Sequence, residues 1–269
     1  MRKEVADMAK IEHPVLIVGA GPGDPELLTI KGMRALQEAD LVLYAGSLVN
    51  GSLLDYCPAG CATVDTSPLT LEEQVEIMSD AVRKGERVVR LHTGDPCLYG
   101  AVAEQREMLQ GMGIEVRFIP GVSCLQAAAA ALGIQYTVPG GSQTLICTRR
   151  AGRTPVPQAE DIRLLAGHGT TMAIFLSADQ AEEVSIDLQA GGCSPDLPAA
   201  CVYRASWEDE ILLVSTLKEL PSLMRERGID RHALIVAGEC VGVRGARSLL
   251  YSPGFSHGAR VGDGGEGAR

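Results

Sequence analysis

Three glycine-centred loops carry the residues of this chain with the clearest potential for chemistry, and each loop follows a short apolar segment. The loops are Gly19-Ala-Gly-Pro-Gly-Asp24, Thr93-Gly-Asp-Pro-Cys-Leu-Tyr-Gly100 and Pro120-Gly-Val-Ser123. In an open sheet of parallel strands, the loops at the carboxyl ends of the strands line one crevice. The sequence therefore predicts a single small-molecule site to which all three loops contribute.

The first loop narrows the choice of ligand. A dinucleotide-binding Gly-x-Gly-x-x-Gly turn needs a third glycine, but Asp24 stands at that place, and its carboxylate would repel a pyrophosphate. A phosphate-binding loop would end in Gly-Lys followed by Ser or Thr, and this ending is absent. A ligand without phosphate fits better, and S-adenosylmethionine, a sulfonium cation, is such a ligand. The alternatives are a tight turn that binds nothing and, for Asp95 and Ser123, plain helix capping.

The composition limits the partners of the protein. Of the 269 residues, 46% are hydrophobic and 22% are charged, which is the balance of a globular chain. The formal net charge of −10 argues against binding to nucleic acid and against attraction to anionic lipid. With neither a secretory signal nor an apolar run long enough for a membrane span, we expect a cytoplasmic protein. We expect no metal site, although Cys57 and Cys61 leave a zinc or redox pair as a minor alternative.

The first half of the chain alternates between strand and helix patterns, which predicts an α/β fold with a mostly parallel sheet. The predicted strands are residues 15–18, 41–44, 88–91 and 115–119, and the predicted helices are residues 25–39, 71–84, 100–110 and 123–132. Asp24 should cap the first helix, and Thr70 with Glu73 should form a capping box on the second. These helices would connect neighbouring strands and leave the glycine loops at one edge of the sheet.

A Gly/Pro-rich break at residues 135–142 suggests a domain junction. Beyond it we predict strands at residues 144–148, 171–176, 199–203, 210–215 and 233–237, and helices at residues 178–191 and 217–228. Only six residues separate the third and fourth of these strands, too few for a parallel crossover, so this half should hold an antiparallel pair in a mixed sheet. The expected domains are residues 14–138 and 143–250, with flexible tails at residues 1–12 and 252–269.

Several segments together resemble the tetrapyrrole methylases, which use S-adenosylmethionine in a cleft between two α/β domains. The resemblance covers about residues 14–243, and its segments include Val18-Gly-Ala-Gly-Pro-Gly-Asp-Pro-Glu-Leu-Leu-Thr29 and Val89-Arg-Leu-His-Thr-Gly-Asp-Pro-Cys-Leu-Tyr-Gly100. Further segments are similar to the branch that methylates ring carbon C11 of precorrin-4 or cobalt-precorrin-4 in cobalamin synthesis. They include Leu43-Tyr-Ala-Gly-Ser-Leu-Val49, Thr148-Arg-Arg-Ala-Gly-Arg-Thr-Pro-Val-Pro157 and Val202-Tyr-Arg-Ala-Ser-Trp-Glu-Asp209.

The resemblance implies two sets of site residues and a methyl transfer that leaves S-adenosylhomocysteine. The implied cofactor contacts are Pro22, Thr93, Gly94, Asp95, Leu98, Ser123, Cys124, Leu176 and Ala205. Because a tetrapyrrole carries many carboxylates, the expected substrate contacts are Arg149, Arg150, Arg153 and Arg204, together with Tyr44, His92 and Tyr99. No catalytic base is assigned, since Ala45 stands where the uroporphyrinogen methylases have an aspartate. Family members also suggest a homodimer.

Three alternatives remain open at this stage. The chain could methylate another ring carbon or act on uroporphyrinogen. It could be a nucleotide-dependent oxidoreductase, against which the missing third glycine counts. It could also be a non-catalytic S-adenosylmethionine sensor, which would bind the cofactor tightly without transferring its methyl group.

Overall fold

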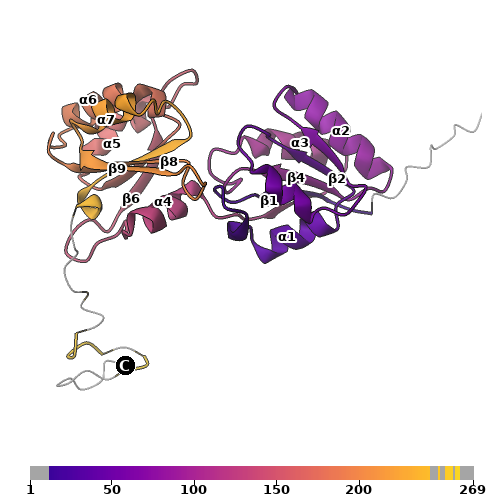
Figure 1. Cartoon of the computed structure of the whole chain (residues 1–269), viewed down its shortest axis with the longest axis horizontal. Helices are drawn as coiled ribbons and strands as arrows, with labels where there is room; N and C mark the ends of the chain where they lie inside the picture. Colours follow the sequence, from indigo (N-terminus) through magenta and orange to yellow (C-terminus); the bar gives the residue numbers. More distant parts are fainter. Residues whose placement is uncertain (1–11, 243–247, 249–251, 257, 261–269) are drawn as a thin grey trace, which may run out of the picture. The chain divides into compact units, whose positions relative to one another are not determined.

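The computed structural model describes residues 12–242, 248, 252–256 and 258–260 of the chain, and Figure 1 shows one sheet in each of two parts. The chain divides into two compact units, Met1–Ala127 and Ala128–Arg269. The predicted junction at residues 135–142 lies C-terminal to this division. Most of the two predicted tails, namely residues 1–11, 257 and 261–269, lies outside the described residues.

The first unit contains a five-stranded sheet in the order β3-β2-β4-β1-β5, and every neighbouring pair is parallel. Its strands are β1 (Val15–Gly19), β2 (Leu41–Tyr44), β3 (Ala62–Asp65), β4 (Val88–His92) and β5 (Val116–Ile119). The parallel sheet is confirmed. β3 was not predicted, because this edge strand has only four residues, is mostly exposed and contains a single strongly apolar residue, Val64.

The helical segments of this unit are η1 (Pro25–Leu27), α1 (Ile30–Gln37), η2 (Gly51–Tyr56), α2 (Leu71–Arg83) and α3 (Val102–Gly111), and α4 (Cys124–Leu132) crosses the division between the units. The predicted single helix over residues 25–39 was wrong. Asp24 caps only the short 3-10 segment η1, Leu28 is extended, and the Thr29 hydroxyl accepts from the Gly32 N–H to start α1. The second capping residue, Thr29, therefore starts a new helix and divides the predicted one in two.

Buried apolar residues cover both faces of this sheet. On one face Val15, Leu41, Leu43 and Val88 pack with residues of α2 and α3, including Met78, Val82 and Leu109. On the other face Val18, Val42, Val89 and Leu91 pack with Leu36 of α1 and Leu53 of η2. The predicted capping box of α2 is confirmed, because the Thr70 hydroxyl and the Glu73 carboxylate exchange hydrogen bonds with each other's backbone N–H groups. A sheet buried on both faces leaves its edges for ligands.

The second unit contains a five-stranded sheet in the order β6-β7-β10-β8-β9. Its strands are β6 (Leu145–Arg149), β7 (Thr171–Phe175), β8 (Pro198–Tyr203), β9 (Ile211–Thr216) and β10 (Ala233–Ala237). The antiparallel pair of β8 with β9 and the mixed sheet are confirmed. Since β7 is parallel to β6, and β10 is antiparallel to both β7 and β8, the strands β6, β7 and β8 run in the same direction.

Helices α5 (Ile162–Ala166), α6 (Ala181–Ala190) and α7 (Leu220–Glu226) cover one face of this sheet (Figure 1), with short segments η3 (Gln158–Glu160), η4 (Ala178–Gln180) and η5 (Glu239–Val241) beside them. Their core includes Ile174, Leu188, Cys201, Met224 and Ile235. Within the described residues, no helix has the length and apolar character that crossing a membrane requires.

Candidate functional site

The three glycine loops meet at the carboxyl edge of the parallel sheet in the first unit. The backbones of Gly21 and Gly94 form a bridge, with N···O distances of 2.8 and 3.3 Å, and the Ala20 N–H donates to the His92 carbonyl at 2.7 Å. The third loop joins them through the Gly121 N–H, which donates to the Asp95 carboxylate at 2.9 Å. The predicted gathering of the loops is thus present in the structure.

Two of the glycines allow the loops to approach one another. A Cβ at Gly121 would lie 2.2 Å from the Gly94 carbonyl oxygen, and a Cβ at Gly19 would lie 2.5 Å from the Gly121 backbone. Neither position tolerates a side chain without moving a neighbouring loop. Gly94 differs, because it has a φ of +60° and its nearest neighbours would be 3.8 Å or more from a Cβ. The first two glycines therefore serve loop packing, and Gly94 serves a left-handed turn.

The Asp95 carboxylate is used on both oxygens. One accepts from the Cys97 N–H at 2.7 Å, which is the helix-cap type of contact, and the other accepts from the Gly121 N–H at 2.9 Å. From the sequence, helix capping and ligand binding were alternative roles for Asp95. The structure shows a third role, in which this carboxylate fixes the second loop to the third.

The other cofactor contacts implied for this unit lie along the same edge. Thr93 donates its hydroxyl to the Leu48 carbonyl at 3.2 Å, and the Ser123 hydroxyl accepts from the Leu125 N–H, so Ser123 does cap α4. Pro22 is buried, whereas Leu98 and Cys124 are half-buried. The structure brings these residues together at one edge without showing what they bind.

Two aromatic residues and one histidine were expected to contact substrate. Tyr44 ends β2 and is half-buried, and Tyr99 is exposed with a positive φ of 56°. The His92 ring faces two backbone carbonyl oxygens, those of Thr93 and Gly100, each at 2.9 Å. Burial of this ring, with the nearby Arg90 charge as a lesser cause, lowers the pKa of His92 below its ordinary value.

Arg90 is a candidate site residue that was not predicted from the sequence. It lies on β4 on the same face as His92, and it is only 7% exposed. Its Nη1 donates to the Leu91 carbonyl at 2.8 Å, whereas its Nε has no hydrogen-bond partner in the described part of the chain. Burial lowers the pKa of Arg90 to about 10, which still leaves the guanidinium charged at neutral pH. Among the residues that the structure describes, no carboxylate pairs with this buried cation, which favours an anionic ligand nearby. An arginine inside the apolar run Val-Val-Arg-Leu was the available signal.

In the second unit, the carboxyl ends of β6, β7 and β8 share one edge of the sheet because these strands run in the same direction. The implied residues at this edge are Arg149, Arg150 and Arg153 after β6, Leu176 after β7, and Arg204 and Ala205 after β8. The topology of the mixed sheet therefore gathers all six.

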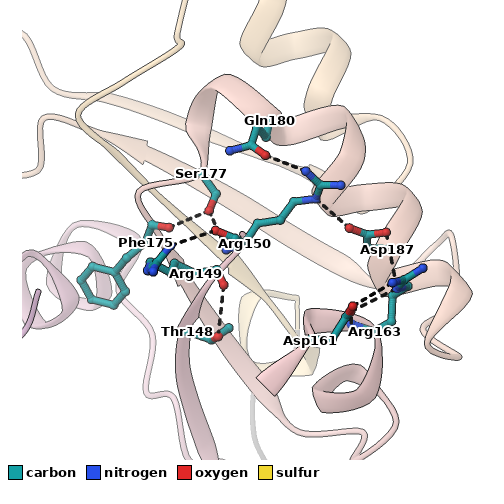
Figure 2. Close-up of polar contacts among 9 residues, drawn as sticks. All are labelled: Thr148, Arg149, Arg150, Asp161, Arg163, Phe175, Ser177, Gln180 and Asp187. Carbon is teal, nitrogen blue, oxygen red and sulfur yellow. Dashed lines mark hydrogen bonds and ion pairs between the residues drawn. The ribbon is translucent and has the colours of Figure 1, made fainter. Parts of the chain in front are cut away.

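Arg149, Arg150 and Arg153 have different surroundings, and Figure 2 shows those of the first two. Arg150 forms an ion pair with Asp187 at 2.7 Å and donates to the Gln180 side chain at 2.6 Å, so its guanidinium is held against α6 and η4. Arg149 donates to the Thr154 and Pro155 carbonyls and thereby holds the loop that follows it. Arg153 is exposed. Of the three, Arg153 has the guanidinium most available to a ligand.

Leu176 is held in an unusual conformation at the end of β7. Its φ is +49°, and 67% of the residue is exposed. The next residue, Ser177, is fully buried, donates its hydroxyl to the Phe175 carbonyl at 2.7 Å and accepts from the Arg150 N–H at 2.9 Å (Figure 2). These contacts fix the turn and present an apolar side chain to solvent.

Strained backbone collects at these two edges. In the part of the chain that the structure describes, the non-glycine residues with positive φ are Tyr99, Ala101, Leu176, Arg204, Ser206 and His232. Tyr99 lies in the second loop of the first unit and Ala101 directly follows it. Three of the others follow β7 or β8, and His232 precedes β10 at the same edge as the end of β8. Such conformations cost about 1–3 kcal/mol each and cluster at functional sites.

Arg204 is presented by its own loop. Its guanidinium lies 4.1 Å from the centroid of the Trp207 ring and pairs with the exposed Asp209 at 3.0 Å, and its backbone N–H donates to the His232 carbonyl. The unusual polar context of Trp207 thus has an explanation, since the indole is a platform for an arginine. Ala205, the neighbouring residue, is buried.

Taken separately, the two edges offer binding and positioning groups. The first offers packed backbone turns, a carboxylate and a buried cation, and the second offers cations and one exposed leucine. Among the residues that the structure describes, no cluster of three or more His, Cys, Asp or Glu side chains is arranged to hold a metal ion. The first edge by itself is typical of α/β proteins that hold a small molecule on glycine loops.

Comparison with known proteins agrees with this class. The profile of the family described as Tetrapyrrole (Corrin/Porphyrin) Methylases matches residues 14–221. The chain is 48% identical, over 90% of its length and 94% of the relative's, to a cobalt-precorrin-4 C(11)-methyltransferase of Methanocaldococcus jannaschii. It is 43% identical, over 88% of its length and 96% of the relative's, to a precorrin-4 C(11)-methyltransferase of Mycobacterium tuberculosis.

Solved structures show the same relationship. A cobalt precorrin-4 methyltransferase of cobalamin biosynthesis superimposes with a TM-score of 0.83 at 44% identity, covering 85% of this chain and 96% of that one. A uroporphyrin-III C-methyltransferase of Thermus thermophilus, in complex with S-adenosylhomocysteine, gives a TM-score of 0.71 at 30% identity and covers 87% of this chain and 96% of that one. The chain therefore belongs to the tetrapyrrole methylase family.

Proposed function

We propose that this chain transfers a methyl group from S-adenosylmethionine to ring carbon C11 of cobalt-precorrin-4 or precorrin-4, in the synthesis of the cobalamin ring. The observation that carries the proposal is the 48% identity, over nearly the whole chain, to a methyltransferase of that specificity. The matched segment includes all three glycine loops. A uroporphyrinogen substrate is less well supported, because the uroporphyrin-III relative in the solved structure is 30% identical.

The cofactor would be held by the loops of the first unit. We assign it to Pro22, Thr93, Gly94, Asp95, Leu98, Ser123 and Cys124, with Leu176 and Ala205 contributed by the second unit. The fit rests on the free space beside Gly94, where a Cβ would meet its nearest atom only at 3.8 Å, and on the absence of an arginine or lysine from the three loops, which suits a ligand without phosphate. The T. thermophilus relative with S-adenosylhomocysteine is a precedent for this ligand in the family.

When bound, the cofactor would supply an electrophilic methyl group that already carries its leaving group. The residues of the chain then have to align two carbons and exclude water, and such positioning can account for about 7–11 kcal/mol of a barrier. The network from Gly21 through Gly94 and Asp95 to Gly121 fixes the three loops relative to one another, which is how this chain would provide alignment. Ala45 supplies no acid or base, so we assign none.

The tetrapyrrole carboxylates would be bound by arginines. We propose Arg153, Arg204 and Arg90 as the main contacts, with Arg149 shaping the loop that carries Arg153. Arg150 is already paired with Asp187 and Gln180, so we propose that it supports this loop instead of the substrate. Tyr44 and Tyr99 remain proposed neighbours of the ring.

A pair of neighbouring variants separates these arginine roles. We expect Arg153→Gln to raise the KM for the tetrapyrrole about tenfold or more, as loss of a charge-assisted hydrogen bond does, with an unchanged melting temperature. We expect Arg150→Gln to lower the free energy of unfolding by about 1–3 kcal/mol, because it leaves the largely buried Asp187 with only the more distant Arg163, at 3.9 Å, as an ion-pair partner. The opposite assignment of the two effects would contradict the proposal.

The proposed activity is tested by incubating the purified chain with methyl-labelled S-adenosylmethionine and cobalt-precorrin-4. We expect the label in the tetrapyrrole at C11, located by NMR, and S-adenosylhomocysteine in equal amount. Label at another carbon would indicate a different ring specificity, and tight cofactor binding without transfer to any precorrin would indicate a sensor. Retention of a nicotinamide nucleotide in place of S-adenosylmethionine would favour the oxidoreductase. We further propose a cytoplasmic homodimer, which light scattering of the purified protein tests for its oligomeric state.

A further inference from the structure

The imidazole of His92 contacts both ends of the second glycine loop. Its Nδ1 lies 2.9 Å from the carbonyl oxygen of Thr93, the next residue, and its Nε2 lies 2.9 Å from the carbonyl oxygen of Gly100, eight residues on. The chain leaves β4 at the first contact and enters α3 just after the second. One half-buried side chain therefore spans the base of the loop.

The number of protons on the ring limits what it can donate. Both neighbours are carbonyl acceptors, and a neutral imidazole has one N–H, so it can donate to only one of them. Only an imidazolium could donate to both. Burial and the charge of Arg90 oppose the imidazolium, whereas the two carbonyls and Asp95 favour it, and the balance lowers the pKa of His92. At neutral pH the ring is therefore neutral and makes one hydrogen bond.

The contact with Gly100 has the larger structural consequence. A bond to Thr93 ties His92 to its own neighbour, but a bond to Gly100 closes the loop. Gly100 stands between two residues in left-handed conformations, Tyr99 with φ +56° and Ala101 with φ +48°. A Cβ at Gly100 would lie 2.2 Å from the Pro96 carbonyl oxygen, so the loop folds tightly back on itself here. We therefore expect this end of the loop to depend on a hydrogen bond from a residue outside it.

We propose that His92 is a positioning residue that donates from Nε2 to the Gly100 carbonyl and so closes the second loop around the residues assigned to the cofactor, Thr93 to Leu98. The inference rests on the proposed function, because it assumes that this loop binds S-adenosylmethionine. It removes His92 from the substrate contacts, since both ring nitrogens face the backbone.

Two variants distinguish the ring nitrogens. The amide nitrogen of glutamine reaches about as far as Nε2, and that of asparagine about as far as Nδ1. For His92→Asn we expect the Kd for S-adenosylhomocysteine, measured by calorimetry, and the KM for S-adenosylmethionine to rise about tenfold, the effect of one lost hydrogen bond. The tetrapyrrole KM and the melting temperature should change little. His92→Gln should stay within about twofold of the wild type, as should the control His168→Gln at an exposed position.

The inference is overturned if His92→Asn binds the cofactor like the wild type, or if the asparagine and glutamine variants are equally impaired. A second measurement does not depend on cofactor binding or on the folding of variants. In ¹⁵N NMR spectra of the wild type at neutral pH, a His92 ring protonated at Nε2 supports the proposal, and one protonated at Nδ1 overturns it. Failure of the wild type to bind S-adenosylmethionine would contradict the proposed function instead, and the NMR result would still decide the hydrogen bond.

Discussion

Asp95 links two of the glycine loops that we propose hold the cofactor. Its two oxygens accept from Cys97 and Gly121, so removing the carboxylate releases the third loop from the second. We expect Asp95→Ala to lower the free energy of unfolding by about 2 kcal/mol, because hydrogen bonds to a charged acceptor are lost, and to weaken S-adenosylhomocysteine binding at least about tenfold. Urea unfolding and calorimetry measure the two effects.

The control for this variant is Asp55→Ala, at an exposed position of η2, which should leave both quantities unchanged. Asp95→Asn should be intermediate, since the amide keeps one acceptor oxygen but directs N–H groups toward a second donor. Unchanged cofactor binding in Asp95→Ala would show that the link between the loops is not needed for the site.

The lowered pKa of His92 gives a pH dependence with a definite sign. The unfolded chain binds a proton at this residue near its ordinary pKa of about 6.5, and the folded chain does so only at lower pH. Below about pH 6.5 the unfolded state therefore holds more protons, and the free energy of unfolding falls as the pH falls toward the native pKa. As the pH falls from about 8 to 5, the free energy of unfolding of the wild type should therefore decrease more than that of His92→Gln. Urea unfolding of both proteins measures this difference.

Other groups cancel in this comparison, because they titrate in both proteins. His232, whose pKa burial also lowers, is the main one. A wild type that gained stability relative to the variant in acid would mean that the folded ring prefers to be charged and to donate to both carbonyls.

At the scale of elements, the site depends on how closely three turns pack. We expect Gly121→Ala to force the loops apart, because its Cβ would lie 2.2 Å from the Gly94 carbonyl oxygen, and to lower both cofactor affinity and the melting temperature. The matched control is Gly111→Ala at the end of α3, where a Cβ would meet no atom within 4 Å. The control should be neutral or slightly stabilising. Cofactor titration and thermal unfolding of both variants check this, and equal behaviour of the two would show that the loops can separate without cost.

The sequence predicts those elements whose pattern is local. Strong apolar segments gave β1, β2 and β4 within a residue or two, and the spacing of Thr70 and Glu73 gave the capping box. The helix over residues 25–39 failed because the choice between one cap and two depends on the Thr29 side chain finding Gly32. The five-residue helix α5 was also missed, since it is too short to show a helical period.

Site roles were harder to predict than elements, because they depend on partners distant in sequence. The sequence gives no reason to assign different roles to Arg150 and Arg153. Only the contacts of Arg150 with Gln180 and Asp187 in the structure distinguish the two. The sequence contains a weaker indication for Arg90, namely a charged residue inside a buried strand. This indication points to a ligand only once the structure shows that no carboxylate among the described residues pairs with Arg90. What a sequence cannot supply is which charges are already neutralised inside the fold.

At the scale of the whole molecule, the protein and its proposed substrate carry net charges of the same sign. The chain has a formal net charge of −10, and the tetrapyrrole carries several carboxylates, so their long-range interaction is repulsive. The arginines proposed to bind these carboxylates act at contact distance. The two effects differ in range, and salt can therefore separate them.

Raising the ionic strength from about 0.01 to 0.15 M shortens the screening length from about 30 to 8 Å. This change removes most of the long-range repulsion, but it weakens contacts at about 3 Å much less, especially near the buried Arg90. We therefore expect the KM for the tetrapyrrole to fall at least about twofold over this range, with the rate at saturation unchanged. The KM for S-adenosylmethionine should not fall, because a ligand with a positive sulfonium is attracted to an acidic protein. Steady-state kinetics at fixed pH measures both, and a tetrapyrrole KM that rises with salt would mean that exposed arginines, Arg153 first among them, dominate the encounter.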